Sequence, residues 1–290
     1  MPRNHRICAL LAAWMSFACL APAAATDTAT VLRPALSMLT VDAGHASLRD
    51  TYLSPITYRG ANIALGYEHF QAIKRNPEQR VSQIETGIAY HHAHNPAGNH
   101  TMHSLMGNFQ WAVMRRWRNA LRLPRSQVMI GPMLQLRGGV IYNPNNANNV
   151  VSAKIFCALG VNAMAVCNTH IGRLPASLRY TLSLPITSVF FSPDYDEAYY
   201  EIYLGNHHGL AHFGWWGNRF DATQALTADF RLGGTILRVG YRGGFEASQI
   251  NHITTRVVTH SVVLGIGGEF LSLSPRKTLS PHAKIISAQY

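Results

Sequence analysis

The chain has 290 residues, a formal net charge of +11 and only 13% charged residues. Ordinary soluble domains carry about 25% charged residues, so this composition argues against a soluble domain. The basic residues are scattered, with one tight cluster at Arg115–Arg118, and they show neither zinc-finger spacing nor a compact basic helix. We therefore expect no nucleic-acid partner.

The first 25 residues have the order of a secretory signal. Arg3 and Arg6 give a basic start, positions 7–21 are almost entirely apolar, and three alanines at 23–25 provide a small-residue cleavage site. The apolar run is too short to cross a bilayer by itself. The sequence therefore predicts that the chain is exported.

We expect a signal peptide at 1–25 and a single domain at 26–290. A buried N-terminal helix, or a lipoprotein anchored through Cys19, would be the alternatives. Beyond residue 25 no apolar run approaches the roughly 20 residues that a transmembrane helix needs. An exported chain that is poor in charge and has no such helix fits a membrane β-barrel, whose strands are apolar on one face only.

Apolar and polar residues alternate with a period of two through most of this domain. In the clearest stretch, the odd positions of 151–165 are all apolar, whereas Ser152, Lys154 and Asn162 lie on the other face. Most stretches have 10 to 16 residues, which is longer than the usual soluble strand of about 5–6. Crossing a bilayer takes about 9–11. The stretches are 59–70, 81–90, 103–117, 127–142, 151–165, 178–186, 198–204, 226–232, 237–242 and 258–269.

These stretches predict an all-β fold, an antiparallel transmembrane β-barrel of 10 strands in the bacterial outer membrane. Residues 36–45 and 282–290 are shorter candidates. If both of them pair, the barrel has 12 strands, which is still an even number, as such barrels require.

The polar faces of the stretches carry both charge signs, which suits a narrow, filled lumen better than the apolar core of a soluble sandwich. We predict a network of ion pairs inside the barrel. Its expected members are Glu68, Glu85, Glu201, Asp229 and Glu269 with Arg116, Arg137, Lys154, Arg179, Arg231, Arg238 and Arg242.

Several segments resemble an uncharacterised exported family of Bacteroides-type bacteria. They are Asp50–Pro55, Tyr58–Gly60, Ala198–Ile202, Gly214–Asp221 and Leu237–Gly243. The likeness covers nearly all of the exported domain. It implies a barrel-like fold and adds no mechanism.

A second, partial likeness is to outer-membrane phospholipase A, which places His, Ser and Asn on the barrel exterior. His207, His208 and Asn218 are the candidates here. The residues two positions beyond the histidines are not serine, so the nucleophile that this chemistry needs would have to come from elsewhere. His260 and Ser261 resemble a fragment of a lipid A deacylase site, although neighbours in an ideal strand point to opposite faces.

Histidines also gather at one predicted loop, at His91, His92, His94, His100 and His103. Such density suggests a metal, but no cysteine or carboxylate lies among them, so we expect a solvated loop, no metal and no cofactor. Three functions remain open. The first is a filled barrel for structure or surface interaction, the second a membrane-embedded lipid hydrolase, and the third a narrow pore. We expect lipid and lipopolysaccharide as partners, and the barrel-assembly machinery during biogenesis.

Overall fold

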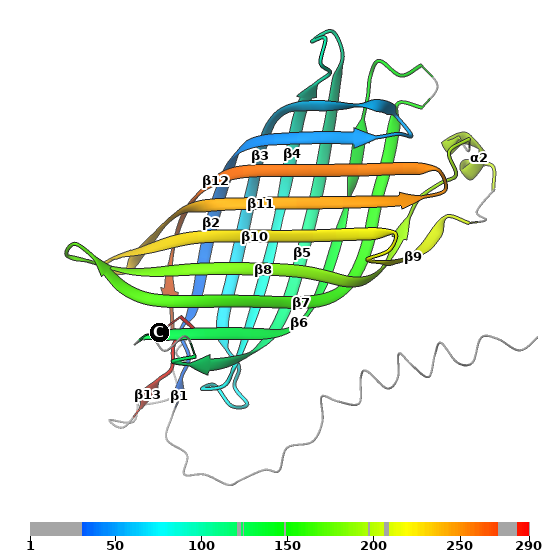
Figure 1. Cartoon of the computed structure of the whole chain (residues 1–290). Helices are drawn as coiled ribbons and strands as arrows, with labels where there is room; N and C mark the ends of the chain where they lie inside the picture. The colour runs from blue at the N-terminus through cyan, green and yellow to red at the C-terminus, as the bar shows by residue number, and fades with distance from the viewer. Residues whose placement is uncertain are drawn as a thin grey trace, which may run out of the picture.

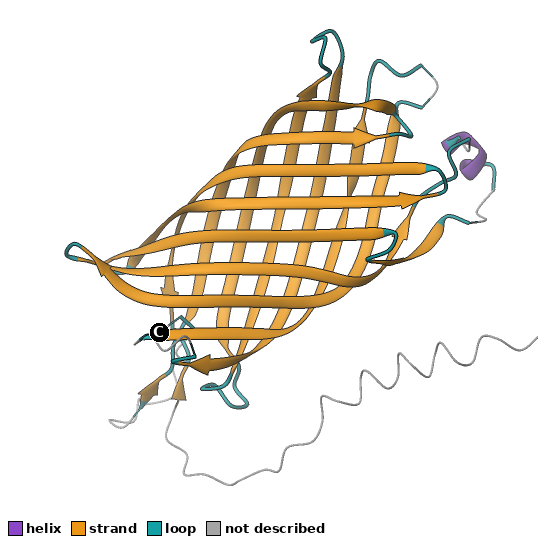
Figure 2. Ribbon diagram, viewed as in Figure 1, coloured by secondary structure: helices purple, strands orange, loops and turns teal. Residues whose placement is uncertain are grey.

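The computed structural model describes residues 31–120, 123, 125–147, 149–196, 198–205, 209–271 and 283–289. Within these residues, ten long strands form one closed antiparallel barrel (Figures 1 and 2). The predicted signal peptide lies outside the described residues. In the described part of the chain, no helix is long and apolar enough to cross a membrane.

Consecutive barrel strands pair with each other, including β8 with β10, and the last strand β12 pairs with the first strand β2 to close the ring. The strands have 14 to 21 residues. Their bounds are β2 Ala35–Asp50, β3 Ser54–Ala72, β4 Arg80–His94, β5 Thr101–Arg118, β6 Ser126–Tyr142, β7 Val151–Ile171, β8 Leu174–Phe191, β10 Arg219–Leu232, β11 Thr235–Ile250 and β12 Ile253–Phe270. An additional strand, β9 (Ala211–Trp215), pairs with the last residues of β8 outside the closed ring.

The alternation in the sequence fixes which side chains face outward. On β7, Ile155 is 59% exposed and Leu159 is 46% exposed. Ala158, which lies between them, and Asn162, which lies three residues beyond Leu159, are at most 1% exposed. The same alternation holds on the other strands: the outer wall is largely apolar, and the inner face carries polar and small residues as well as apolar side chains near the two ends. The ten-strand barrel predicted from the sequence is therefore confirmed.

One predicted strand is wrong. Residues 198–204 do not join the sheet, because Tyr199–Tyr203 form the short helix α2 in the long connection between β8 and β10. Glu201 lies on this helix and is exposed, so it is not in the lumen. The tenth strand is instead β2, which contains the shorter candidate 36–45.

The other shorter candidate, 282–290, does not become a barrel strand. Lys284 and Ile285 form the two-residue strand β13, which pairs in parallel with β1 (Val31–Leu32). The residues that follow β13 turn into the mouth of the barrel, where Ile286 and Ala288 are buried. The last barrel strand is therefore β12.

The two ends of the barrel differ. We call the end that holds the start of β2 and the end of β12 the terminus end. Its connections are short, at 73–79, 119–125, 172–173 and 233–234. The opposite end, the loop end, carries the 192–218 connection with α2 and β9, and Figure 1 shows these two elements together beyond the strand ends.

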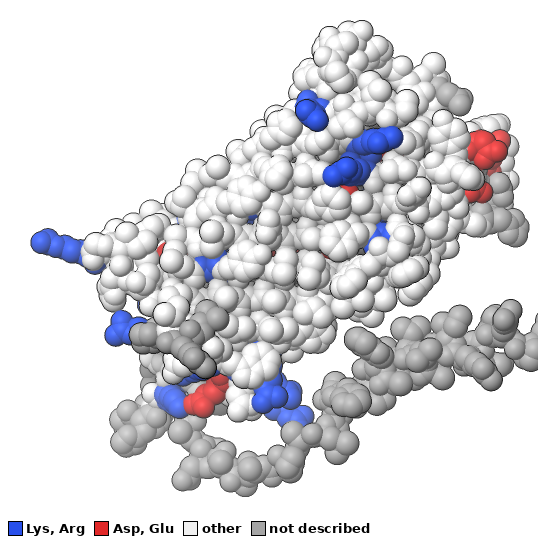
Figure 3. Space-filling model, viewed as in Figure 1, with Lys and Arg blue, Asp and Glu red and all other residues white. Residues whose placement is uncertain are grey.

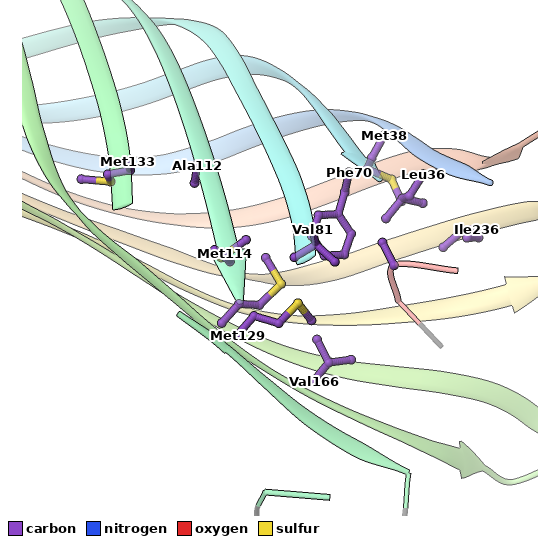
Figure 4. Packing of buried hydrophobic residues seen from close by; sticks show 12 residues of the cluster. Leu36, Met38, Phe70, Val81, Ala112, Met114, Met129, Met133, Val166 and Ile236 are labelled. Atoms are coloured by element: carbon purple, nitrogen blue, oxygen red, sulfur yellow. The ribbon is translucent and has the colours of Figure 1, made fainter. Parts of the chain in front are cut away.

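Apolar side chains fill the lumen near both ends. The terminus-end cluster contains Phe70, Met114 and Met129 at 0% exposure. Figure 4 shows these side chains pointing into one common region inside the barrel. The loop-end cluster is built around Tyr52, Tyr58 and Met102. The polar part of the lumen lies between these two clusters.

Candidate functional site in the barrel lumen

The most deeply buried ion pairs form a layer beside the terminus-end cluster. The Arg179 guanidinium donates to both carboxylate oxygens of Glu68, at 2.9 and 2.6 Å. Arg238 donates to Glu68 at 2.6 Å and to Asp229 at 2.6 and 2.7 Å. All four residues are less than 9% exposed. Four adjoining charges thus neutralise one another, as burial of charge requires.

Uncharged polar side chains extend this layer across the barrel. Gln83 donates to Glu68 at 2.7 Å, and Asn162 donates to Gln83 at 2.7 Å. Ser183 then donates to Asn162 at 2.8 Å and accepts from Gln110. These bonds join β3, β4, β5, β7 and β8 through the interior, so the layer links opposite walls of the barrel.

Arg242 makes a second group of ion pairs nearer the middle of the lumen. Its guanidinium lies 2.6 Å from Glu85 and 3.1 Å from Asp42. Because β2, β4 and β11 supply these three residues, the group also spans the barrel.

The third group lies toward the loop end. Glu246 accepts from Arg137 at 2.5 Å and from Arg219 at 3.2 Å, while Arg219 also pairs with Asp221 at 2.7 Å. The Arg219 guanidinium stacks over the Phe156 ring at 4.0 Å. The charged lumen therefore continues up to the apolar loop-end cluster.

Most members of the predicted network occupy the lumen in ion pairs. Lys154 pairs with Asp50 at 2.8 Å, and Arg231 pairs with Glu269 at 2.7 Å. Arg116 lies inside as well but is bound by carbonyl groups rather than by a carboxylate. Sequence reasoning missed the members Asp42, Asp50, Arg219, Asp221 and Glu246. Extending the alternation of 237–242 by four residues would have placed Glu246 on the inner face.

The C-terminal tail closes the terminus end. Arg116 donates to the Ser287 carbonyl at 2.7 Å, and Gln127 donates to the Gln289 carbonyl at 2.7 Å. The Gln289 side chain in turn donates to Asp229 at 3.0 Å. These bonds tie the tail to the innermost charged layer, and nothing in the sequence pattern indicated this role.

A polar cavity of about 160 Å³ remains between the charged groups. Asp42 Oδ1, Asn62 Oδ1, His91 Nδ1 and Gln135 Oε1 are buried without a hydrogen-bond partner among the described residues, and all four residues line this cavity. A polar cavity of this size can hold several water molecules. Packed apolar clusters lie on both sides of it.

The candidates for hydrolysis that the structure describes do not form a catalytic pair. His207 and His208 lie outside the described residues. Asn218 holds a turn, donating to the Phe213 carbonyl and accepting from the Trp215 amide, both at 2.9 Å. Among the described residues, no histidine ring forms a hydrogen bond with a serine hydroxyl.

The pair His260 and Ser261 divides between the two faces of β12. His260 lies on the outer wall, where Tyr241 Oη is 2.5 Å from its Nδ1 atom. Ser261 faces the lumen and accepts from Asn62 at 2.6 Å. Strand geometry therefore separates the two groups that a direct dyad would need.

The clustered histidines lie on both faces of the barrel wall. His91 lines the cavity, whereas His92 and His103 contact each other on the outer wall, with Nδ1 atoms 3.3 Å apart. Tyr90 approaches His103 at 2.8 Å. In the described part of the chain, no group of His, Cys, Asp or Glu side chains has the arrangement that could hold a metal ion.

Comparison with solved structures returns bacterial surface and transport barrels. Neisserial surface protein A has 8% identity and a TM-score of 0.33, over 81% of this chain and 97% of that one. The transport unit of the Escherichia coli autotransporter AIDA-I has 10% identity and a TM-score of 0.39, over 81% and 90%. The translocator domain of NalP from Neisseria meningitidis has 9% identity and a TM-score of 0.32, over 92% and 95%. At these scores we draw no functional conclusion from them.

No curated protein matches the chain. A family model described as "Protein of unknown function (DUF3316)" matches residues 7–277, almost the whole length. This agrees with the resemblance to an uncharacterised family, although the match does not test a Bacteroides-type source. The chain belongs to the DUF3316 family.

Proposed function

We propose that this chain is an outer-membrane β-barrel with a closed lumen, which acts as a lipid-embedded scaffold rather than as a pore or a hydrolase. The observation that carries the proposal is the reversal of polarity across the wall. Every Asp and Glu within the ten described barrel strands is in a lumenal ion pair, whereas the outer wall is covered with exposed aliphatic and aromatic side chains.

Exposed apolar residues occur on every barrel strand, so they encircle the barrel rather than form one patch. A surface of this kind is unfavourable in water, where apolar patches are limited to a few hundred Å², and favourable against acyl chains. Examples from successive strands are Val41, Leu65, Ile88, Leu105, Leu136, Ile155, Tyr180, Leu226, Val239 and Leu264.

The filled lumen favours a scaffold over a pore. A conducting pore needs a continuous aqueous path, and this interior contains an apolar cluster at each end with cross-barrel ion pairs between them. The separation of His260 from Ser261 gives the hydrolase no support. In a scaffold, the outer wall contacts lipid and the 192–218 connection at the loop end is the surface for partners.

Fractionation of cells that express the full chain tests the membrane location. We expect the protein in the outer-membrane fraction, with a gel band that migrates differently before and after boiling, because a closed barrel resists detergent until it is heated. Recovery as a soluble periplasmic protein would refute the proposal. We also expect outer-membrane lipid and lipopolysaccharide to be its partners, and the barrel-assembly machinery during biogenesis, which crosslinking in the same cells would detect.

A further inference from the structure

We infer that the outer wall binds the phosphate group of an anionic membrane lipid between Arg49 and Arg256, near the loop end. This inference rests on the proposed membrane location. It concerns a site on the outer wall that is separate from the charged lumen.

Arg49 and Arg256 lie directly opposite each other on neighbouring strands. Their Cα atoms are register partners in the β2–β12 ladder, and both side chains are exposed. Arg59 on β3 lies opposite Ser47, one diagonal step from Arg49, and is also exposed. We call Arg49, Arg59 and Arg256 the cationic rim. Figure 3 shows blue side chains on an otherwise mostly white wall, over the loop-end part of β2, β3 and β12 as these are placed in Figure 1.

Within the part of the chain that the structure describes, the charges of this rim have no counter-charge. Among the described residues, no carboxylate forms an ion pair with any of the three arginines, because the carboxylates of the strands all face the lumen. Like charges directly opposite each other destabilise a strand pair. An anion bound between Arg49 and Arg256 would attract both guanidinium groups and so offset their mutual repulsion.

The chemistry of the site selects a phosphate. Guanidinium groups bind phosphate oxygens through paired, charge-assisted hydrogen bonds. Arg256 is also positioned, since its guanidinium stacks over the Phe245 ring at 5.3 Å. One phosphate between two such groups can accept from both.

The position of the site selects a lipid as the source of that phosphate. Along the same two strands toward the terminus end, the outer wall passes the opposed, exposed pair His45 and His260. It then continues with exposed Val41 and Leu39 on β2 and with Val262 and Leu264 on β12. This surface suits acyl chains. A lipid whose chains cover it would bring its headgroup to the level of the cationic rim.

The test uses the purified full chain, folded into vesicles of phosphatidylcholine alone or with added phosphatidylglycerol. The readouts are the urea concentration at half-unfolding and the number of anionic lipids retained in native mass spectrometry. We expect phosphatidylglycerol to stabilise the wild type. Arg49→Gln and Arg256→Gln should each weaken the retention of that lipid by about tenfold, the value of one charge-assisted hydrogen bond, and the double variant should be hardly worse than either single one.

Arg173→Gln is the matched control, because Arg173 is an exposed arginine in the short β7–β8 turn at the other end of the barrel. It should behave like the wild type. In phosphatidylcholine alone, Arg49→Gln should be at least as stable as the wild type, because the substitution removes a repulsion. Arg49→Gln is the cleaner of the two rim variants, since Arg256→Gln also loses the contact with Phe245.

Three results would overturn the inference. The first is equal lipid retention by the rim variants and Arg173→Gln. The second is additive losses from the two rim substitutions, which indicate general attraction rather than one shared phosphate. The third is full stabilisation by inorganic phosphate over phosphatidylcholine vesicles, which would assign the site to a soluble anion. If the wild type does not insert into any vesicle, the proposed membrane function itself fails.

Discussion

At the scale of single residues, Glu68 is the carboxylate that the lumen can least lose. It accepts from Arg179, Arg238 and Gln83 at once. Glu68→Gln keeps the side-chain volume but leaves Arg179 without a carboxylate, whereas Arg238 retains Asp229. Removing one partner of a buried pair costs about 3–5 kcal/mol, so we expect a loss of about 3 kcal/mol in urea unfolding in vesicles.

Glu201→Gln is the control for this experiment. Glu201 is also an acidic residue, but it is exposed on α2, and its substitution should leave the free energy of unfolding almost unchanged. If Glu68→Gln were as stable as Glu201→Gln, the buried layer would contribute nothing to the stability of the barrel.

Single-residue roles were only partly predictable from the sequence. Alternation placed Glu68, Arg179 and Arg238 on the inner face, because the face on which a strand side chain lies depends only on whether its position is odd or even. It could not pair them, since Glu68 and Arg238 are 170 positions apart and their meeting depends on the register and closure of the barrel. The same rule predicted that the consecutive residues His260 and Ser261 lie on opposite faces of their strand, and the structure places them so.

At the scale of elements, the short helix α2 holds the long 192–218 connection against the loop end. Tyr199 Oη accepts from the Ala153 amide at 2.6 Å, and its ring meets Tyr52 edge-on at 5.8 Å. A phenol is protonated at neutral pH, and burial raises the pKa of the Tyr199 phenol further. This one side chain therefore links the connection to β7 and to the loop-end cluster.

We expect Tyr199→Ala to release the connection while the barrel stays folded. Hydrogen exchange of the connection should become about tenfold faster or more, because one partly buried hydrogen bond and one aromatic contact are lost. The β-strand amides should keep their protection. Tyr203→Ala is the comparison, since Tyr203 is 84% exposed on the same helix. Equal effects of the two substitutions would show that Tyr199 has no anchoring role.

The same helix shows where period-two reading fails. Residues 198–204 alternate as a strand should, yet seven residues beyond the rim of the barrel have no neighbouring strand to pair with. Without that partner, local hydrogen bonds such as Leu204 N to the Tyr200 carbonyl at 3.0 Å prevail. In contrast, β7 alternates over many more residues and has partners on both sides, so its pattern was decisive.

At the scale of the whole molecule, charge and apolar surface are arranged by the same alternation. Acidic residues of the strands are inside, where arginine or lysine side chains pair with them, and the outer wall keeps only cations near its edges. Cross-barrel pairs such as Arg242 with Glu85 connect distant strands. Such pairs across the interior are what the proposed scaffold role would need, whereas a pore would need an open path along the lumen.

This arrangement predicts that the barrel stays closed even without its C-terminal tail. In planar lipid bilayers we expect no stable conductance from the full chain, and none from a variant that lacks residues 284–290. The tail covers only the terminus end, and the Glu68 layer and the loop-end cluster would still block the path. A heat-modifiable gel band would show that the shortened chain is folded, and a porin in the same bilayers would show that channels are detectable. A steady current from the folded shortened chain would mean that the tail is the principal closure, and the protein would then be a plugged pore rather than a filled scaffold.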